Sequence, residues 1–330
     1  MRILLTHTPD ARARYYGETA LAELRRLGEV RLNPTAEPLG TASLVEKASD
    51  CEIIVSDRQT PAPAILFERS PHLVAFVRCA MDIRNVDVGA ASAAGVLVTR
   101  ASAGFVDSVA ELAIGCMVDL GRGTSAAVSA YRAGRSPEIR MGIQLTGATL
   151  GIVGCGAIGR RLGAIARSLG MTVLAADPDP GAVPSGIERV EFAELLRRSR
   201  FVVCLAPATP ETRNLMGATE FAAMPRGAFF VNLSRGELVD EAALLASLDS
   251  GHLAGAAVDV GMAPDQMPSP EVAAHRKVIA TPHIGGLTAE AVSHQAFDTV
   301  RQVASLSRGE VPDYAVNADA ALRLARFRRA

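Results

Sequence analysis

The stretch Thr149-Leu-Gly-Ile-Val-Gly-Cys-Gly-Ala-Ile-Gly159 joins an apolar strand, a glycine turn and the start of a helix, which we expect over Arg160 to Leu169. Gly154 permits a tight turn, Gly156 lets the backbone approach a pyrophosphate, and Gly159 permits close packing of the helix on the strand. Unpaired N–H groups at the start of the helix favour a negatively charged group. The stretch therefore predicts a dinucleotide-binding site.

An acidic residue ends the next predicted strand, Met171 to Ala176. The carboxylate of Asp177 is placed to accept hydrogen bonds from both hydroxyls of an adenosine ribose. Because NADP carries a phosphate on one of these hydroxyls, Asp177 favours NAD as the cofactor. A glycine pattern alone is weak support, but strand, turn, helix and acid occur here in register.

Length and composition predict a soluble protein of about two domains. No uninterrupted apolar stretch among the 330 residues approaches the ~20 that a membrane span requires. Met1 to Thr6 resembles a short strand rather than a signal peptide, so we expect a cytoplasmic location. The net charge of -1, with both signs interspersed, suggests neither a nucleic acid nor a membrane as partner.

The cysteines are scattered and form no C-x-x-C pair. This pattern suits reduced, buried thiols better than a disulfide framework or a zinc site, and we expect no metal. The five are Cys51, Cys79, Cys116, Cys155 and Cys204.

Strands and helices alternate along the chain, which predicts parallel sheets covered by helices on both faces. A helical pattern over Thr288 to Leu306 is expected to return the chain to its first unit. We therefore expect a discontinuous substrate domain, 1–100 plus 287–330, and a nucleotide-binding domain, 101–286. The expected strands are Met1 to Thr6, Cys51 to Val55, Leu73 to Phe76 and Val96 to Thr99 in the first unit, and Leu150 to Val153, Thr172 to Ala175, Phe201 to Leu205, Ala228 to Asn232, Gly255 to Val258 and Val278 to Ala280 in the second.

Three side chains that can bind anions or exchange protons follow strands of the second unit. Arg235 comes just past one strand and before a helix expected near Asp240, Asp259 ends the next strand, and His283 follows the last one. Ligands of open α/β sheets bind at the carboxyl ends of the strands. A guanidinium binds a carboxylate with two parallel hydrogen bonds, and an imidazole donates or accepts a proton. The three residues therefore predict an active site for an anionic carbonyl compound.

The chain resembles the D-2-hydroxyacid dehydrogenase family, which includes D-lactate, D-3-phosphoglycerate, phosphite and formate dehydrogenases. The resemblance covers nearly the whole chain. It implies an α/β fold of two doubly wound parallel-sheet domains, a Rossmann domain and a flavodoxin-like substrate domain. Five motifs in order carry the resemblance: Val109-Ala-Glu-Leu-Ala-Ile-Gly115, the glycine stretch, Leu205-Ala-Pro-Ala-Thr-Pro-Glu-Thr-Arg-Asn-Leu215, Asn232-Leu-Ser-Arg-Gly-Glu-Leu-Val-Asp-Glu241 and Thr281-Pro-His-Ile-Gly-Gly286.

The resemblance also implies roles for individual residues. Arg235 would bind the substrate carboxylate and carbonyl, and His283 would protonate the carbonyl oxygen while the nicotinamide delivers hydride to the carbon. A homodimer through the nucleotide-binding domain is typical of the family. Besides Asp177 and the three glycines, the implied cofactor contacts are Ala157, Ile158, Leu205, Pro207, Thr212, Leu233, Ser234, Arg235, Asp259, His283, Gly285 and Gly286.

The chain departs from the family at the expected partner of His283. The family places a glutamate five residues after the position of Asp259, and this chain has Pro264 there. Asp265 is the expected replacement if the loop carries one extra residue. Gln266 is the alternative, since an amide orients the ring without adding charge, as in formate dehydrogenases.

A second departure lies in the loop expected to hold the substrate carboxylate. Where the family has a glycine-containing turn, this chain has Ala80, Met81 and Asp82, followed by Arg84. A carboxylate aimed at an anionic substrate is repulsive, so Asp82 is expected to turn away or to contact a hydroxyl or cationic group. Arg58 either adds a second contact to the anion or forms an exposed salt bridge.

The sequence thus favours an NAD-dependent dehydrogenase that interconverts a D-2-hydroxy acid and its 2-oxo acid. Two alternatives stay open. One is the oxidation of a simple anion such as phosphite or formate, and the other is a catalytically weak NAD(H)-sensing protein that resembles a corepressor. The presence of both Arg235 and His283 disfavours the sensor.

Overall fold

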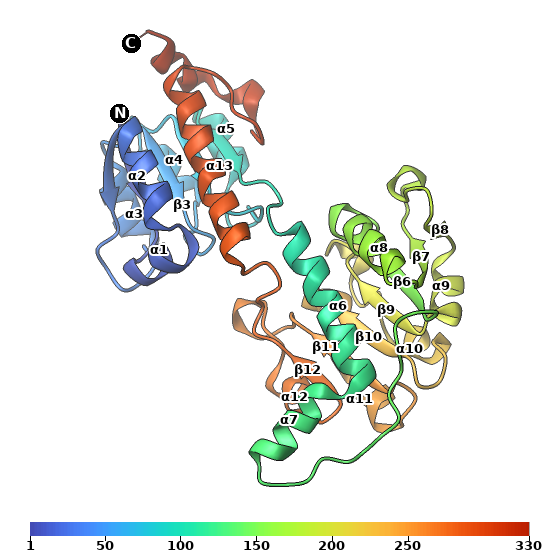
Figure 1. The fold of residues 1–330 in the computed structure, drawn as a ribbon. Helices are drawn as coiled ribbons and strands as arrows, with labels where there is room; N and C mark the ends of the chain where they lie inside the picture. The colour runs from blue at the N-terminus through green and yellow to red at the C-terminus, as the bar shows by residue number, and fades with distance from the viewer. Residues whose placement is uncertain (330) are drawn as a thin grey trace. The chain divides into compact units, whose positions relative to one another are not determined.

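The computed structural model describes residues 1–329, without the side chains of Asp265, Arg328 and Arg329. The chain forms two compact units (Figure 1). Unit 1 comprises Met1–Gly104 and the chain from Ala289 onward, and unit 2 comprises Phe105–Thr288. The chain therefore crosses between the units twice, after Gly104 and after Thr288.

The sheet of unit 1 is entirely parallel, in the order β2-β1-β3-β4-β5. This is the flavodoxin-like strand order. The sequence predicted four of its strands and missed β2, an edge strand whose Glu-Val-Arg-Leu residues are only partly buried. The strands are β1 (Arg2–Leu5), β2 (Glu29–Leu32), β3 (Ile53–Ser56), β4 (Ala75–Arg78) and β5 (Leu97–Arg100).

Helices cover both faces of this sheet. Successive residues of β1 point to opposite faces, so Ile3 and Leu5 join the apolar cluster under α2 and α13, and Leu4 joins the cluster under α3, α4 and α5. Helix α13, near the end of the chain, packs against α2, near its beginning (Figure 1). The helices are α1 (Pro9–Tyr15), α2 (Glu18–Leu27), α3 (Thr41–Ala48), α4 (Ala64–Arg69), α5 (Val88–Ala93) and α13 (Ala289–Ser307), and short 3-10 helices follow at η5 (Ala318–Ala320) and η6 (Leu322–Arg329).

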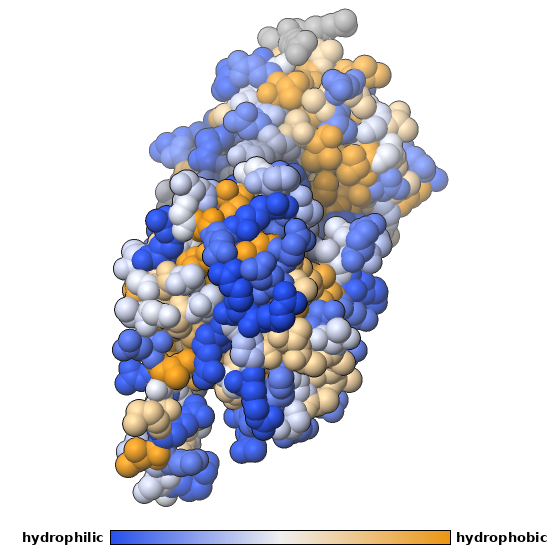
Figure 2. Space-filling model, turned by 90° about the vertical axis from the view of Figure 1, so that its right-hand side faces the viewer, coloured by the Kyte–Doolittle hydropathy of each residue, from blue (hydrophilic) through white to orange (hydrophobic). Residues whose placement is uncertain are grey.

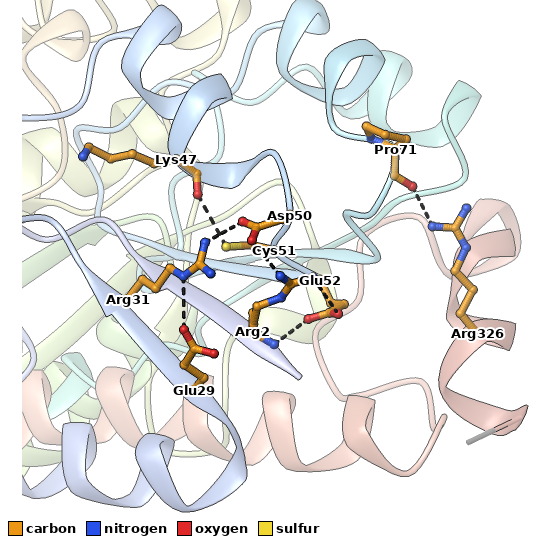
Figure 3. A network of polar contacts seen from close by, with 9 residues as sticks. All are labelled: Arg2, Glu29, Arg31, Lys47, Asp50, Cys51, Glu52, Pro71 and Arg326. Carbon is orange, nitrogen blue, oxygen red and sulfur yellow. Dashed lines mark hydrogen bonds and ion pairs between the residues drawn. The ribbon is translucent and has the colours of Figure 1, made fainter.

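A polar network ties the edge strand β2 to the amino ends of β1 and β3 (Figure 3). Arg2 and Arg31 both bind the carboxylate of Asp50, at 2.7 and 2.5 Å, and Arg31 also reaches Glu29 at 3.3 Å. The hydrogen bond from Arg31 holds the pKa of Asp50 below its ordinary value. All four groups are exposed to water, so this network adds little stability and mainly fixes the position of β2.

The sheet of unit 2 is also entirely parallel, in the order β12-β11-β10-β9-β6-β7-β8. Counted from β6, the order is 3-2-1-4-5-6-7, which is the Rossmann order with one added strand. The prediction of two doubly wound parallel sheets is confirmed. The sequence missed only β8, which is two residues long. The strands are β6 (Thr149–Val153), β7 (Thr172–Ala176), β8 (Glu188–Arg189), β9 (Phe201–Cys204), β10 (Phe229–Asn232), β11 (Gly255–Val258) and β12 (Val278–Ala280).

The helices of unit 2 also cover both faces of their sheet. Residues of α6 and α8 lie in one apolar cluster, and residues of α9, α10, α11 and α12 lie in the other. Helix α8 begins at Ala157 and ends at Ser168, because Gly156 serves as its N-cap. The sequence predicted a later start, with the helix over Arg160 to Leu169. The helices are α6 (Val106–Arg122), α7 (Thr124–Arg132), α8 (Ala157–Ser168), α9 (Phe192–Arg198), α10 (Ala218–Ala223), α11 (Glu241–Asp249) and α12 (Pro270–Ala274).

Within residues 1–329, no helix combines the length and the apolar character that a bilayer span requires. All five cysteines are buried as free thiols. Burial raises the pKa of Cys79, Cys116 and Cys204 to about 12, so these thiols are poor nucleophiles at neutral pH.

Candidate active site

The three glycines of the turn after β6 differ in the space around them. Gly154 has a φ of +90°, and a Cβ there would lie 2.6 Å from the backbone nitrogen of Ala206. A Cβ on Gly159 would lie 2.5 Å from the carbonyl oxygen of Gly154. A Cβ on Gly156, by contrast, would meet nothing within 4 Å. The turn is therefore closed against the protein at its first and third glycines and open at its second, next to the first N–H groups of α8.

Asp177, directly after β7, points its carboxylate at this turn. One carboxylate oxygen accepts the N–H of Cys155 at 2.7 Å, and the other accepts the N–H of Asp179 at 2.9 Å. A carboxylate has about four acceptor positions, so two stay available to a ligand. Burial and the charge of Asp177 raise the pKa of the Cys155 thiol, which keeps this residue of the turn neutral.

The loop after β9 flanks the turn on its other side. Leu205 donates its N–H to the carbonyl of Val153 at 2.8 Å, which extends the pairing of β9 with β6. The hydroxyl of Thr212 donates to the carbonyl of Pro207 at 2.7 Å and accepts the N–H of Thr209 at 2.8 Å. Thr212 therefore fixes the fold of this loop beside the glycine turn.

Arg235 follows β10 and is held there by a neighbour that sequence reasoning did not single out. The side-chain amide of Asn232 donates to the carbonyl of Arg235 at 2.9 Å and accepts the N–H of Ser234 at 3.2 Å. The hydroxyl of Ser234 donates to the carbonyl of Ala206, which joins this loop to the one after β9. The half-buried Arg235 guanidinium donates to the carbonyl of Ser234 at 2.7 Å. A polar residue at the end of the apolar run Phe-Phe-Val was the available signal for Asn232.

Asp259, directly after β11, anchors the loop that carries His283. One carboxylate oxygen accepts the Thr281 hydroxyl at 2.7 Å and the Ile284 N–H at 2.8 Å. The other oxygen accepts the N–H of Gly285 at 2.7 Å. His283 itself has a φ of 55°, in the left-handed region that few non-glycine residues adopt. The hydrogen bonds on both sides of His283 maintain this conformation.

The loops after β10 and β11 lie in direct contact. A Cβ on Gly236 would overlap with the backbone of Gly261, so only glycine permits this approach. Since β10, β11 and β12 are neighbours in the sheet, Arg235, Asp259 and His283 follow three adjacent strands at one edge. Leu233, two residues before Arg235, is buried, and Gly286 follows Gly285 in the His283 loop.

The proposed partners of His283 lie in the loop after β11. Pro264, Asp265 and Gln266 form the 3-10 helix η4, and the carbonyl of Gln266 accepts the N–H of Gly261 at 2.9 Å. The side chain of Asp265 lies outside the described part of the chain. The choice between Asp265 and Gln266 therefore stays a prediction.

The residues predicted to bind the substrate from unit 1 lie at the carboxyl edge of its sheet. Arg58 follows β3 and is exposed, while Ala80, Met81 and Asp82 follow β4. The amide of Asn85 donates to the carbonyl of Arg58 at 3.2 Å, which joins the two loops.

Two arginines organise these loops. Arg84 binds both carboxylate oxygens of Asp82, with its Nη2 at 2.8 Å from Oδ2 and its Nε at 3.1 Å from Oδ1. Asp82 therefore contacts a cationic group of its own loop, so its charge is largely neutralised. Arg78, which is 0% exposed, donates to the carbonyl of Thr60 at 3.0 Å and to the side chain of Asn85 at 2.6 Å.

No cluster of His, Cys, Asp or Glu suited to a metal ion occurs in the part of the chain that the structure describes. The polar groups of the carboxyl edge in unit 2 are instead a guanidinium, an imidazole and backbone N–H groups. Groups of this kind bind anions and exchange protons.

A family model described as "D-isomer specific 2-hydroxyacid dehydrogenase, NAD binding domain" matches residues 114–285. The D-3-phosphoglycerate dehydrogenase of Methanocaldococcus jannaschii is 33% identical over 91% of this chain and 57% of its own length. The glyoxylate reductase of Korarchaeum cryptofilum is 30% identical over 91% of this chain and 93% of its own length. The apo-structure of the D-lactate dehydrogenase of Escherichia coli has a TM-score of 0.81 and 26% identity, over 96% of this chain and 100% of that one. The chain spans about half the length of the matched D-3-phosphoglycerate dehydrogenases, which are covered to 57%, 49% and 48%.

Proposed function

Because the chain belongs to the D-isomer specific 2-hydroxyacid dehydrogenase family, we propose that it is an NAD-dependent oxidoreductase that interconverts a D-2-hydroxy acid and its 2-oxo acid. One observation carries this proposal. The dinucleotide turn, Arg235 and a His283 loop held by Asp259 all follow strands of one parallel sheet, at its carboxyl edge. Reduction of a 2-oxo acid needs a hydride donor, a group that holds the carboxylate and a proton donor, and these residues supply the last two functions.

The cofactor contacts follow from the form of the loops. The open space at Gly156 and the first N–H groups of α8, at Ala157 and Ile158, suit a pyrophosphate. Asp177 suits the ribose, and it makes NAD the cofactor that we propose. The bound nicotinamide supplies the hydride to the carbonyl carbon, or takes it back from the alcohol. The remaining proposed contacts are Leu205, Pro207, Thr212, Leu233, Ser234, Gly285 and Gly286.

Arg235 and His283 divide the substrate chemistry. The Arg235 guanidinium binds the carboxylate with two parallel hydrogen bonds and draws electron density from the adjacent carbonyl oxygen. His283 donates a proton to that oxygen as the carbon gains the hydride, and it accepts the same proton when the alcohol is oxidised. Asp259 acts indirectly in this scheme, because it holds the His283 loop.

The partner of His283 is proposed to be Asp265, with Gln266 as the alternative. A carboxylate beside the ring favours the imidazolium, whereas an amide only orients the ring. If Asp265 is the partner, Asp265→Asn is expected to shift the pH–rate profile, whereas Gln266→Ala should lower the rate only if Gln266 orients the ring. An unchanged profile for Asp265→Asn would exclude Asp265 as the partner.

We also propose that the substrate is a small anion and that the protein is a homodimer formed through unit 2. The Asp82–Arg84 ion pair supports the first point, since it removes an uncompensated negative charge from the substrate loop.

Ile139 and Met141, in the segment between α7 and β6, are 100% and 97% exposed, which suits apolar side chains that a second copy covers. Ile139→Ser together with Met141→Ser is expected to yield a monomer in sedimentation.

The decisive assay measures the initial rate of NADH oxidation with a panel of 2-oxo acids: glyoxylate, hydroxypyruvate, phenylpyruvate, 2-oxoglutarate and 3-phosphohydroxypyruvate. Turnover that disappears in His283→Gln but persists in His275→Gln supports the proposal. His275 is a suitable control because it precedes β12, at the amino ends of the strands, where it contacts Asp249. Silence across the panel despite NADH binding would favour oxidation of a simple anion or a nucleotide sensor.

A further inference from the structure

Two arginines lie beside loops of the proposed nucleotide site, Arg189 at Asp177 and Arg160 at the glycine turn. Arg189 Nη2 donates to the backbone carbonyl of Asp177 at 3.3 Å, and Arg160 Nη1 lies 3.4 Å from the backbone carbonyl of Cys155. Both side chains are exposed, and within residues 1–329 neither forms an ion pair with a carboxylate. Each cation therefore stands beside a loop of the nucleotide site with most of its donors available to a ligand.

The position of Arg189 follows from the edge strand β8. Arg189 pairs with Ala175 of β7, so its backbone lies beside the strand end that leads to Asp177. Its neighbour Glu188 points to the other face of the sheet, as successive strand residues do. There Glu188 binds Arg198 at 2.8 and 2.9 Å. Because Arg198 neutralises Glu188, that carboxylate does not compete for Arg189.

The charges on the loops that contain Cys155 and Asp177 are balanced. Asp177 and Asp179 each contribute one negative charge, and Arg189 and Arg160 each contribute one positive charge. In a site with a lone aspartate, a phosphate on the ribose meets only repulsion, whereas a nearby arginine accommodates the 2′-phosphate of NADP. The guanidinium also presents a planar set of donors that matches phosphate oxygens. The side of unit 2 that carries β8 and α9 is largely hydrophilic, so a phosphorylated ribose there stays in contact with water (Figure 2).

We propose that Arg189, assisted by Arg160, forms a subsite for the 2′-phosphate of an adenosine nucleotide, so that this chain binds NADP(H) as well as NAD(H). The inference rests on the proposed function, because it assumes that the glycine turn and Asp177 bind an adenosine dinucleotide. Arg189 is then a specificity-determining residue that offsets the preference set by Asp177.

The test compares two small probes by isothermal titration calorimetry, adenosine 5′-monophosphate and adenosine 2′,5′-bisphosphate, so no substrate or turnover is needed. The intact protein is expected to bind the bisphosphate at least as tightly as the monophosphate. Arg189→Ala is expected to weaken binding of the bisphosphate about five- to tenfold and binding of the monophosphate less than twofold, since an exposed charge-assisted contact is lost. Arg189→Lys should recover part of the loss, and Arg197→Ala, an exposed arginine of α9, should change neither affinity. Added salt should weaken the bisphosphate more than the monophosphate.

Three outcomes would overturn the inference, and they are distinguishable. Equal losses for both probes in Arg189→Ala would mean that Arg189 only fixes the Asp177 loop. If the intact protein binds the bisphosphate more than about tenfold more weakly than the monophosphate, Asp177 is the dominant residue and the inference fails, while the proposed function stands. Failure of the intact protein to bind either probe or NADH would remove the proposed function as well.

Discussion

Replacing Asp259 by Asn tests whether the His283 loop depends on one buried carboxylate. Asp259 is 2% exposed, and its two oxygens accept three hydrogen bonds, from Thr281, Ile284 and Gly285. An asparagine has one acceptor oxygen. If that oxygen keeps the contacts to Thr281 and Ile284, its NH2 group faces the N–H of Gly285, and neither donor finds an acceptor.

The expected effect is large for a change of one atom. A hydrogen bond to a charged group contributes about 1.5–3 kcal/mol, and a buried N–H left without an acceptor costs about 1–3 kcal/mol. Relief of the buried charge offsets part of this, so we expect Asp259→Asn to destabilise the loop by about 3 kcal/mol. That free energy corresponds to an opening constant raised about 100-fold.

The assay is native-state hydrogen exchange at the amides of Ile284 and Gly285, together with urea unfolding. Asp240→Asn is the matched control, since Asp240 caps α11 by accepting the N–H of Ala243 at 3.0 Å and Asn caps a helix equally well. The control should change the free energy of unfolding by less than about 0.5 kcal/mol. Unchanged exchange at Gly285 in Asp259→Asn would refute the reasoning, because the carboxylate would then not hold the loop.

Three further predictions concern other parts of the molecule. Gly154→Ala places a Cβ 2.6 Å from the nitrogen of Ala206 at a φ of +90°, so we expect the free energy of unfolding, measured by heat or urea, to fall by about 2–4 kcal/mol. Gly156→Ala should keep the wild-type stability and lose NADH binding. Equal stabilities of the two variants would contradict this prediction. Burial lowers the pKa of His7 from 6.5 to about 4, so the unfolded state takes up a proton first as the pH falls, and the free energy of unfolding should decline between pH 6.5 and 4. His7→Gln should remove up to about 3 kcal/mol of that decline, and an equally steep slope in the variant would argue against His7 as its source. Arg78→Met removes the hydrogen bonds to the loops after β3 and β4 and should cost about 3 kcal/mol in chemical unfolding; wild-type stability would show that these bonds contribute nothing net.

Local patterns predicted both sheets and the glycine turn, because each depends on neighbours in the chain. The first and third glycines of the turn each face a backbone contact, and the second faces open space, as their spacing indicated. The edge strand β2 escaped prediction because charged residues alternate with its two apolar ones and none of the four is fully buried, and β8 escaped because it is only two residues long and both are charged. The start of α8 was placed three residues late, since Gly156 gave no side-chain signal of an N-cap.

The sequence by itself determined the order of strands and helices, the nucleotide turn and the positions of Arg235, Asp259 and His283 after successive strands. Only the tertiary structure decided what holds those side chains. It brought Asn232 under the Arg235 loop, Asp259 against both sides of His283 and Arg84 onto Asp82. Hydrogen bonds act over about 3 Å. The partners of a loop residue therefore depend on which strands lie side by side, and sequence spacing alone does not determine that arrangement.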